Sequence, residues 1–211
     1  MRIRIKICGI TTLEAALAAV EAGADALGFV FAPSKRKVEP ETVKHICSVI
    51  PALVSRVGVF VNSSPQDVKC CMETCGLNTL QFHGEETPEY LRHFDNCSTI
   101  KAISVKNRGF VEMIRSYPKS TLLLDAYHPH YKGGSGQAFD WSLLNEIPAN
   151  ISFLLAGGLN PENVTEALRV VRPYGLDVSS GVETKGQKDP HKIYAFINQV
   201  RRWEEHEGHI T

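Results

Sequence analysis

The sequence lacks a net charge and a long apolar run. Its 211 residues contain 23 Lys and Arg against 23 Asp and Glu. The formal net charge of +0 therefore gives no reason to expect a nucleic acid or a membrane surface as a partner. No apolar run approaches the length of a membrane span, and the first residues alternate charge with isoleucine, which is typical of a strand and not of a signal peptide. We therefore expect a cytoplasmic protein.

The sequence also lacks a regular cysteine pattern. No pair of CxxC motifs supports a zinc site. Without an export signal, irregularly spaced cysteines are typical of reduced thiols in a cytoplasmic enzyme. The six positions are Cys8, Cys47, Cys70, Cys71, Cys75 and Cys97.

Predicted strands alternate with predicted helices along the whole chain. Apolar runs such as ALGFVF at 26–31 are typical of strands covered on both faces. A proline directly after Ser64, Thr87 or Asp189 is typical of the first turn of a helix. Thr11 and Glu14 have the spacing of a capping box, which predicts a helix from about Thr12 that ends at Gly23. The first expected strand ends at Cys8, and the others span 26–31, 54–61, 78–83, 99–103, 121–125, 151–156 and 176–179. The expected helices span 12–22, 40–50, 65–75, 108–116, 141–146 and 190–207, with two more that begin at Thr87-Pro88 and at Asn160-Pro161.

Eight strand–helix units imply a parallel sheet, and their short length favours a closed (β/α)8 TIM barrel. The alternative is an open doubly wound sheet, but the chain reads CGITTLE after the first strand, without a dinucleotide-binding fingerprint. No linker or low-complexity segment interrupts the sequence. We therefore expect residues 1–211 to form one barrel domain.

Cys8 lies on the polar face of the first strand. Ile3, Ile5 and Ile7 share one face because side chains alternate with period two, and Lys6 shares the other face with Cys8. A cysteine is usually a small buried hydrophobe. A nearby ammonium group, however, favours thiolate over thiol, so Lys6 makes Cys8 a candidate base or nucleophile.

Barrel active sites are built from the carboxyl ends of the strands and the loops that follow them. AGGLNPENV and SSGVE follow the last two strands, where glycine-rich loops commonly bind a phosphate. The bland explanation is that these glycines only make turns. The candidate residues collected by this rule are Cys8, Arg36, Gln81, His83, Asp125, Gly157, Gly158, Ser179, Ser180 and Gly181.

Asp125 and Arg36 are candidates for two different tasks. Asp125 ends an apolar strand, so we expect few solvent contacts and a carboxyl group that favours its protonated form. It could then act as the acid beside a basic thiol, or it could belong to a structural hydrogen-bond network. Arg36 lies in a basic loop that could clamp a carboxylate at the barrel mouth.

Metal binding is not the preferred interpretation of the histidines. His128 and His130 lie two residues apart in a long glycine-rich loop at 126–138, and this spacing is unlike that of catalytic metal ligands. Cys71 and Cys75 share a face of the helix at 65–75, where packing explains them.

Together these motifs resemble the phosphoribosylanthranilate isomerase family of tryptophan biosynthesis, in order and over essentially the whole chain. The matching segments are KICGIT at 6–11, GFVF at 28–31, SKR at 34–36, LQFHGEE at 80–86, LLDA at 123–126, GGSGQAFDW at 133–141, AGGLNPENV at 156–164 and DVSSGVE at 177–183.

The resemblance implies an Amadori rearrangement of N-(5-phosphoribosyl)anthranilate to 1-(2-carboxyphenylamino)-1-deoxyribulose 5-phosphate, the third step of the pathway. It implies Cys8 as general base, Asp125 as general acid, and Arg36 as the group that binds the anthranilate carboxylate. It assigns the phosphate to the loops at Gly157-Gly158 and 179–181. It implies no cofactor and no metal, because the reaction has no redox step.

Two other functions stay open: a metal-dependent phosphosugar epimerase, and a barrel that binds a phosphorylated ligand without catalysis. The presence of both Cys8 and Asp125 argues against the second, since binding alone needs neither. The expected partner is a small phosphorylated substrate. Whether the chain is a monomer or a homodimer stays open as well.

Overall fold

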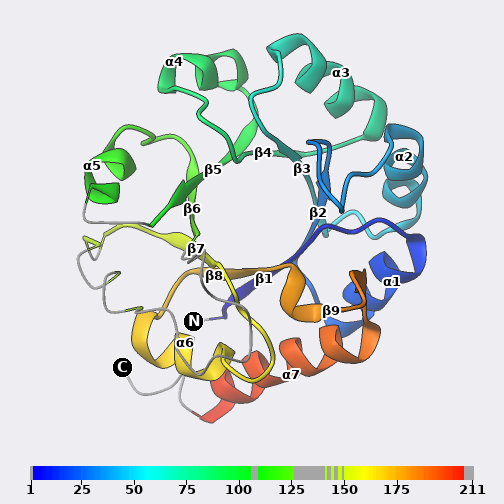
Figure 1. The fold of residues 1–211 in the computed structure, drawn as a ribbon, viewed down its shortest axis with the longest axis vertical. Coiled ribbons are helices and arrows are strands. Elements are labelled where there is room, and N and C mark those ends of the chain that lie inside the picture. Colours follow the sequence, from blue (N-terminus) through cyan, green and yellow to red (C-terminus); the bar gives the residue numbers. More distant parts are fainter. Residues whose placement is uncertain are drawn as a thin grey trace.

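The chain folds into a closed barrel of eight parallel strands surrounded by helices (Figure 1). This computed structural model describes residues 2–105, 109–125, 141, 144, 147–148 and 150–206. The strands follow one another around the barrel in chain order, and the first closes the ring by pairing with the eighth. The prediction of a (β/α)8 barrel is confirmed.

The elements agree with the sequence pattern to within a few residues. The barrel strands are β1 Arg4–Cys8, β2 Ala26–Val30, β3 Ser55–Phe60, β4 Thr79–Phe82, β5 Ser98–Ser104, β6 Thr121–Asp125, β7 Phe153–Ala156 and β8 Gly175–Val178. The helices are α1 Leu13–Ala22, α2 Pro40–Val49, α3 Pro65–Cys75, α4 Pro88–Leu91 with the 3-10 turn η1 Arg92–Phe94, α5 Phe110–Arg115, α6 Val164–Val171 and α7 Pro190–His206.

The strand alternation separates two cores. The barrel interior contains a small cluster formed by Val57, Ile100, Ala102, Leu123, Leu154 and Ala156. The larger cluster lies between the sheet and the helices and includes Ile5 and Ile7 of β1 and Leu122 and Leu124 of β6. Since Leu123 faces inward and its neighbours face outward, Asp125 falls on the inward face at the end of β6. By the same argument Cys8 and Lys6 lie on the face of β1 opposite the isoleucines.

Two predicted helix starts are corrected by the hydrogen bonds at the helix ends. Thr12, not Thr11, caps α1, because its Oγ1 accepts the N–H of Ala15 at 3.2 Å. The α6 helix begins at Val164 rather than at Pro161, because the side chain of Asn160 accepts the N–H groups of 162 and 163 in a separate turn. Gly23, in contrast, ends α1 as predicted, with a φ of 98°.

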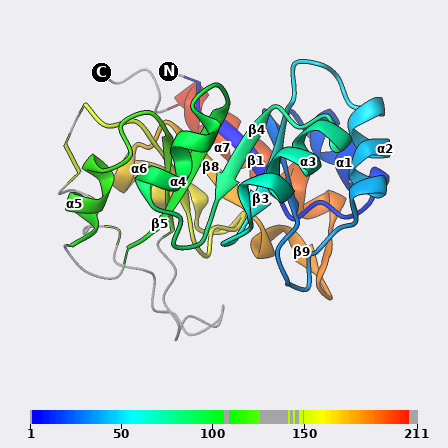
Figure 2. The same ribbon diagram turned by 90° about the horizontal axis from the view of Figure 1, so that it is seen from above.

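A short hairpin after β8 was not predicted. The 3-10 turn η3 Ser180–Val182 leads into β9 Glu183–Thr184, which pairs antiparallel with β10 Gln187–Lys188. Figure 2 shows β9 at the same end of the barrel as the loop after β2, opposite the end where the N-terminus lies. The carboxyl ends of the barrel strands open toward this hairpin.

Some predicted features lie outside the described residues. These are the loop at 126–138 with its two histidines, the start of the helix at 108–116, and most of the helix at 141–146. Within the described ranges, no helix is both long enough and apolar enough to cross a membrane.

Candidate active site

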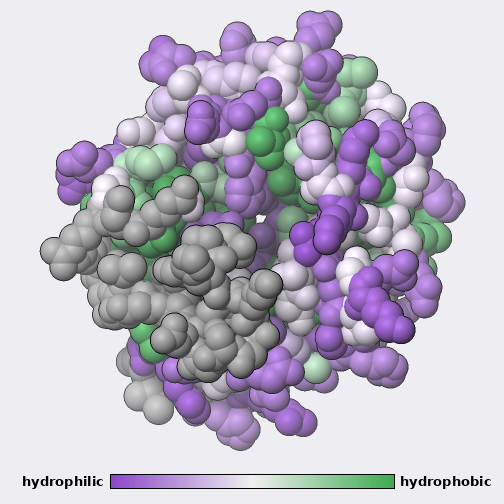
Figure 3. All heavy atoms as spheres, viewed as in Figure 1, coloured by the Kyte–Doolittle hydropathy of each residue, from purple (hydrophilic) through white to green (hydrophobic). Residues whose placement is uncertain are grey.

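A cavity of about 400 Å³ opens at the carboxyl end of the barrel. Figure 3 shows a depression at the centre of this face, bordered by hydrophilic side chains in its visible part. Nine of the ten predicted site residues line the cavity, and nine further lining residues include Pro33, Ser34 and Asp177. The exception is Gly181, which packs beneath Leu159 instead. The rule that collected residues from the ends of different strands therefore collected residues of one cavity.

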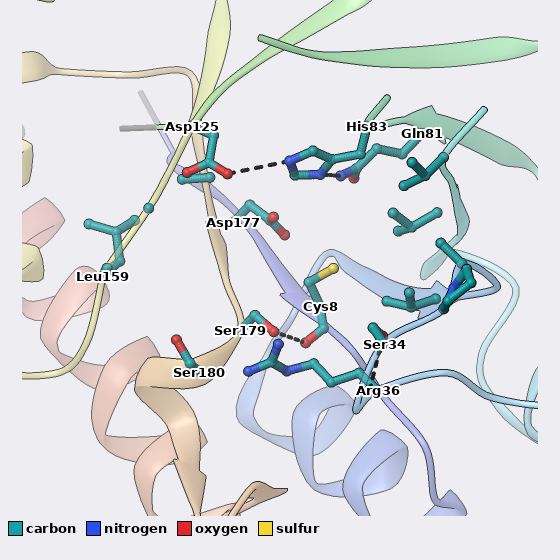
Figure 4. Close-up of a pocket in the computed structure, with 18 residues that line it drawn as sticks. Cys8, Ser34, Arg36, Gln81, His83, Asp125, Leu159, Asp177, Ser179 and Ser180 are labelled. Carbon is teal, nitrogen blue, oxygen red and sulfur yellow. Dashed lines mark hydrogen bonds and ion pairs between the residues drawn. The ribbon is translucent and has the colours of Figure 1, made fainter. Parts of the chain in front are cut away.

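The Cys8 side chain points into this cavity from the end of β1 (Figure 4). The residue is 8% exposed, and its carbonyl accepts a hydrogen bond from Ser179 Oγ at 3.0 Å. Gly28, opposite it on β2, leaves room for the sulfur, since a Cβ at that position would lie 2.8 Å from Cys8 Sγ. The neighbouring strands thus hold Cys8 by its backbone and leave its thiol group facing the cavity.

Lys6 and Asp177 form a buried ion pair next to Cys8. Lys6 Nζ donates to Asp177 Oδ1 at 2.7 Å, and the two side chains are 2% and 8% exposed. Burial lowers the pKa of Lys6, but Asp177 and Cys8 outweigh this effect and hold the lysine pKa above its usual value. Lys6 is therefore a cation held mainly by a carboxylate and not by the thiol.

The acidity of Cys8 depends on burial and on Asp177 as well as on Lys6. Burial raises the pKa of the Cys8 thiol, the Lys6 ammonium lowers it, and the Asp177 carboxylate raises it again. Lys6 thus favours the thiolate as expected, but the net direction of the pKa shift is upward. The physical reason is desolvation, which penalises the charged form and exceeds the attraction of one ammonium that already has a partner.

Asp125 faces Cys8 across the cavity and lies next to His83 (Figure 4). His83 Nε2 lies 3.3 Å from Asp125 Oδ2, and His83 Nδ1 lies 3.2 Å from Gln81 Nε2. The Asp125 side chain is 22% exposed and therefore only partly open to solvent. Asp125 ends β6 at the cavity, where the His83 imidazole is one of its neighbours.

Arg36 is held in place by a carboxylate from the hairpin. Its Nε and Nη2 donate to the two carboxylate oxygens of Glu183 at 2.6 and 3.0 Å. Lys188 Nζ donates to the same carboxylate at 2.5 Å and to the carbonyl of Ser179 at 3.1 Å. Burial raises the pKa of Glu183, but the hydrogen bonds from Arg36 and Lys188 outweigh burial and hold that pKa below its ordinary value. The cluster joins the loop after β2 to the loop after β8.

The two glycine-rich loops meet at the other side of the cavity. Gly157 and Gly158 have φ values of 95° and 67°, a conformation that side chains with a Cβ rarely adopt. Gly181 approaches the first loop so closely that a Cβ there would lie 1.9 Å from the carbonyl oxygen of Leu159. Ser179 and Ser180 line the same cavity as Gly157 and Gly158. Backbone N–H groups and a serine hydroxyl group at such a junction of two loops are groups that can bind an anion.

Three polar residues near the cavity were missed in the sequence. Asp177 follows from the alternation, since it shares a face with Ser179 two residues later. Glu183 and Lys188 depend on the unpredicted hairpin, and no sequence pattern brings them to Arg36. His128 and His130 lie outside the described residues. Within the part of the chain that the structure describes, no group of three His, Cys, Asp or Glu side chains could hold a metal ion.

Comparisons with known proteins agree on one family. A family model described as N-(5'phosphoribosyl)anthranilate (PRA) isomerase matches residues 5–199. The N-(5'-phosphoribosyl)anthranilate isomerase of Desulforudis audaxviator (strain MP104C) is 51% identical over 199 residues, which cover 93% of this chain and 97% of that protein.

Two solved structures resemble the barrel over nearly its whole length. One is a phosphoribosyl anthranilate isomerase in complex with reduced 1-(o-carboxyphenylamino)-1-deoxyribulose 5-phosphate, with a TM-score of 0.83 and 43% identity over 95% of this chain and 99% of that one. The other shows monomers of the dimeric phosphoribosylanthranilate isomerase from Thermotoga maritima, with a TM-score of 0.81 and 42% identity over 94% of this chain and 98% of that one.

Proposed function

Because the chain belongs to the N-(5'-phosphoribosyl)anthranilate isomerase family, we propose that Cys8 and Asp125 carry out its isomerisation as general base and general acid. The family consists of aldose–ketose isomerases of tryptophan biosynthesis. The substrate is N-(5-phosphoribosyl)anthranilate and the product is 1-(2-carboxyphenylamino)-1-deoxyribulose 5-phosphate, whose reduced form the related complex contains.

The first step, ring opening, requires a general acid. Protonation of the ribose ring oxygen opens the aminoaldose to an imine, and Asp125 is assigned this proton transfer. Its contact with His83 Nε2 at 3.3 Å supports the assignment, since a histidine can orient the carboxyl group and exchange a proton with it. Gln81 in turn holds the other ring nitrogen of His83.

The second step, removal of the proton on C2, requires a general base. The imine makes the proton on C2 acidic, and the Cys8 sulfur removes it to give an enolamine, which then relaxes to the ketone. A thiol whose pKa is raised is ionised to a smaller extent at neutral pH, but its thiolate is the stronger base. Lys6 and Lys188 stabilise this thiolate, because both lower the pKa of Cys8. No redox step occurs, and no cofactor or metal enters the proposed chemistry.

The two ends of the substrate are assigned to opposite sides of the cavity. Arg36 has five N–H donors, of which Glu183 engages two, so donors remain for the anthranilate carboxylate. The phosphate is assigned to Gly157, Gly158, Ser179 and Ser180, with Gly181 setting the approach of the two loops. Binding at both ends orients C2 toward Cys8 and the ring oxygen toward Asp125.

One observation carries this proposal: an acid and a thiol face each other across a cavity that also contains the arginine and the glycine-rich loops (Figure 4). The test uses freshly made phosphoribosylanthranilate and follows the loss of its fluorescence. Cys8→Ala and Asp125→Asn should each lower kcat by about 10²–10⁴ while the melting temperature changes little. Cys47→Ala, a buried cysteine away from the cavity, is the matched control and should keep wild-type turnover.

Near-wild-type turnover in either variant would contradict the assigned roles. Loss of activity on addition of a chelator would instead favour a metal-dependent epimerase, and binding without turnover would favour a ligand-binding barrel.

Two broader proposals accompany the mechanism. The related enzyme from Thermotoga maritima is described as dimeric, and sedimentation analysis of this chain distinguishes a homodimer from a monomer. All six cysteines are free, which supports a reducing compartment and therefore the cytoplasm.

A further inference from the structure

Glu86 and Lys101 form an ion pair that is closed to solvent and separate from the proposed chemistry. Lys101 Nζ lies 2.8 Å from Glu86 Oε2, and the side chains are 2% and 1% exposed. Neither residue lines the active-site cavity. Lys101 lies on the outer face of β5, because its neighbours Ile100 and Ala102 belong to the barrel interior. Burying two charges is unfavourable compared with an apolar pair of similar size, so stability alone does not explain this one.

The pair binds the backbone of the loop that follows β4. Glu86 Oε2 accepts the N–H of Gly84 at 2.9 Å, and Lys101 Nζ donates to the carbonyl of Gly84 at 2.7 Å. Both polar backbone groups of Gly84 are therefore bound by the two buried charges. Gly84 is the residue directly after His83.

The same carboxylate also binds the preceding loop. Glu86 Oε1 accepts the N–H of Asn62 at 2.7 Å, just beyond the end of β3. The side chain of Asn62 then accepts the N–H of Glu85 at 2.8 Å, and Tyr117 donates to the carbonyl of Glu86 at 2.9 Å. Burial raises the pKa of Glu86, but the hydrogen bonds from Lys101 and from the backbone outweigh it and keep the carboxyl group ionised. An ionised carboxylate can accept all of these bonds at once.

His83 lies between this network and the cavity. Its backbone N–H is bound by the carbonyl of Phe60 at 2.9 Å, and its backbone continues into Gly84. Its side chain reaches Asp125 at 3.3 Å (Figure 4). Because neither Gly84 nor Phe60 can shift without breaking these bonds, the backbone that carries the imidazole is held on both sides of His83.

We infer that Glu86 and Lys101 are positioning residues for the isomerisation: they hold the backbone after His83 so that its imidazole meets the Asp125 carboxyl group. This inference rests on the proposed role of Asp125 as general acid. The catalytic arrangement at Asp125 would then depend on a charged pair outside the cavity, on the outer face of the sheet.

The test combines Glu86→Gln with His83→Ala in a double-mutant cycle. Glutamine has the same size as glutamate, but it has only one acceptor oxygen in place of two. Its NH₂ group would face an N–H donor that the carboxylate now accepts. We expect Glu86→Gln to lower kcat at least tenfold and to change KM less than twofold, since a small misplacement of a catalytic group is costly in rate. In the His83→Ala background the same substitution should change kcat less than twofold. Equal losses in both backgrounds would overturn the inference.

Stability is measured in parallel, because Glu86→Gln also weakens the fold. Val43→Ala in α2 removes buried apolar volume away from the cavity and serves as the control, with a lower melting temperature and an unchanged kcat. If Val43→Ala lowers kcat as much as Glu86→Gln does, the effect is one of stability and the inference fails. Tyr117→Phe, which removes one bond to the same loop, provides a milder variant should Glu86→Gln not fold. It should show a smaller loss of kcat and the same dependence on His83.

A readout without substrate separates this inference from the proposed function. In protein labelled at histidine with ¹⁵N, the ring resonances of His83, assigned by their absence in His83→Ala, should shift in Glu86→Gln and stay in place in Val43→Ala. Unshifted His83 resonances would overturn the inference even if Asp125→Asn is inactive. Shifted resonances with a fully active Asp125→Asn would support the positioning of His83 and contradict the assignment of the acid.

Discussion

Lys6 and Asp177 lie directly opposite each other on β1 and β8, the two strands that close the barrel, and their side chains meet at 2.7 Å. Both charges act on the Cys8 thiol, in opposite directions: the ammonium lowers its pKa and the carboxylate raises it. Burial of the thiol also raises its pKa, and this effect is larger than that of either charge. The acidity of the proposed base therefore depends on a pair of residues 171 positions apart in the chain.

The first prediction concerns the thiol itself. Removing the Asp177 charge should lower the pKa of Cys8, because the carboxylate raises it and the remaining Lys6 ammonium lowers it. The rate of alkylation by iodoacetamide, followed for the Cys8 peptide by mass spectrometry against pH, should have its midpoint above that of an ordinary thiol in the wild type and at lower pH in Asp177→Asn. Burial raises the pKa of Cys47 to about 11, and this cysteine is the internal reference. Its alkylation midpoint should be the same in Asp177→Asn as in the wild type. A midpoint that rises in Asp177→Asn would refute this account.

The second prediction concerns stability in acid. The folded pKa of Glu183 lies below its ordinary value, since the bonds from Arg36 and Lys188 outweigh burial. A depressed carboxyl pKa contributes stability above the unfolded pKa, near 4.5, and this contribution is lost as pH falls through the folded pKa. The melting temperature should therefore be flat from pH 7 to about 5 and fall below about 4.5, by about 2–4 °C for each kcal/mol lost.

Glu183→Gln should start from a lower melting temperature at pH 7 and fall less steeply in acid than the wild type. Glu39→Gln is the control, because Glu39 pairs with Lys37 at the surface and its side chain is 70% exposed. Its acid slope should match that of the wild type. Parallel slopes for Glu183→Gln and the wild type would show that the Arg36–Glu183 pair does not account for the acid loss.

The third prediction concerns the proposed phosphate loops. A Cβ at Gly181 would lie 1.9 Å from the Leu159 carbonyl oxygen, a backbone atom that cannot move without shifting the loop. Gly181→Ala should therefore separate the two loops and raise KM at least tenfold, with a smaller effect on kcat, as should happen when a binding group distant from the reacting atoms is lost. The affinity for inorganic phosphate, measured by calorimetry, should fall by a similar factor to the rise in KM.

Gly76→Ala at the end of α3 is the matched control. Gly76 has a φ of 65° with no atom within 4 Å of an added Cβ, so alanine strains the helix end without touching the loops. It should lower the melting temperature and leave KM unchanged. A wild-type KM in Gly181→Ala would remove these loops from the proposed phosphate site.

Much of the barrel could be predicted because the signals act over a few residues. The alternation of β1 assigns Ile5 and Ile7 to the outer core. Ser64 caps α3 because its side chain accepts the N–H of Asp67, only three residues later. The same signals misplace a boundary where two capping residues compete, as Thr11 and Thr12 do. They miss the hairpin at 183–188, whose strands are two residues each and too short to show a period.

The sequence by itself determined the order of the strands and nine of the residues that line the cavity, because these follow from local alternation and from the geometry of a closed barrel. The motifs also indicated the family. Only the tertiary structure decided which charges meet: Lys6 with Asp177, Arg36 with Glu183, Glu86 with Lys101. It also decided that the Cys8 thiol is less acidic than its neighbour Lys6 suggests, since ion pairing and desolvation depend on side chains distant in sequence and on the water that the folded barrel excludes.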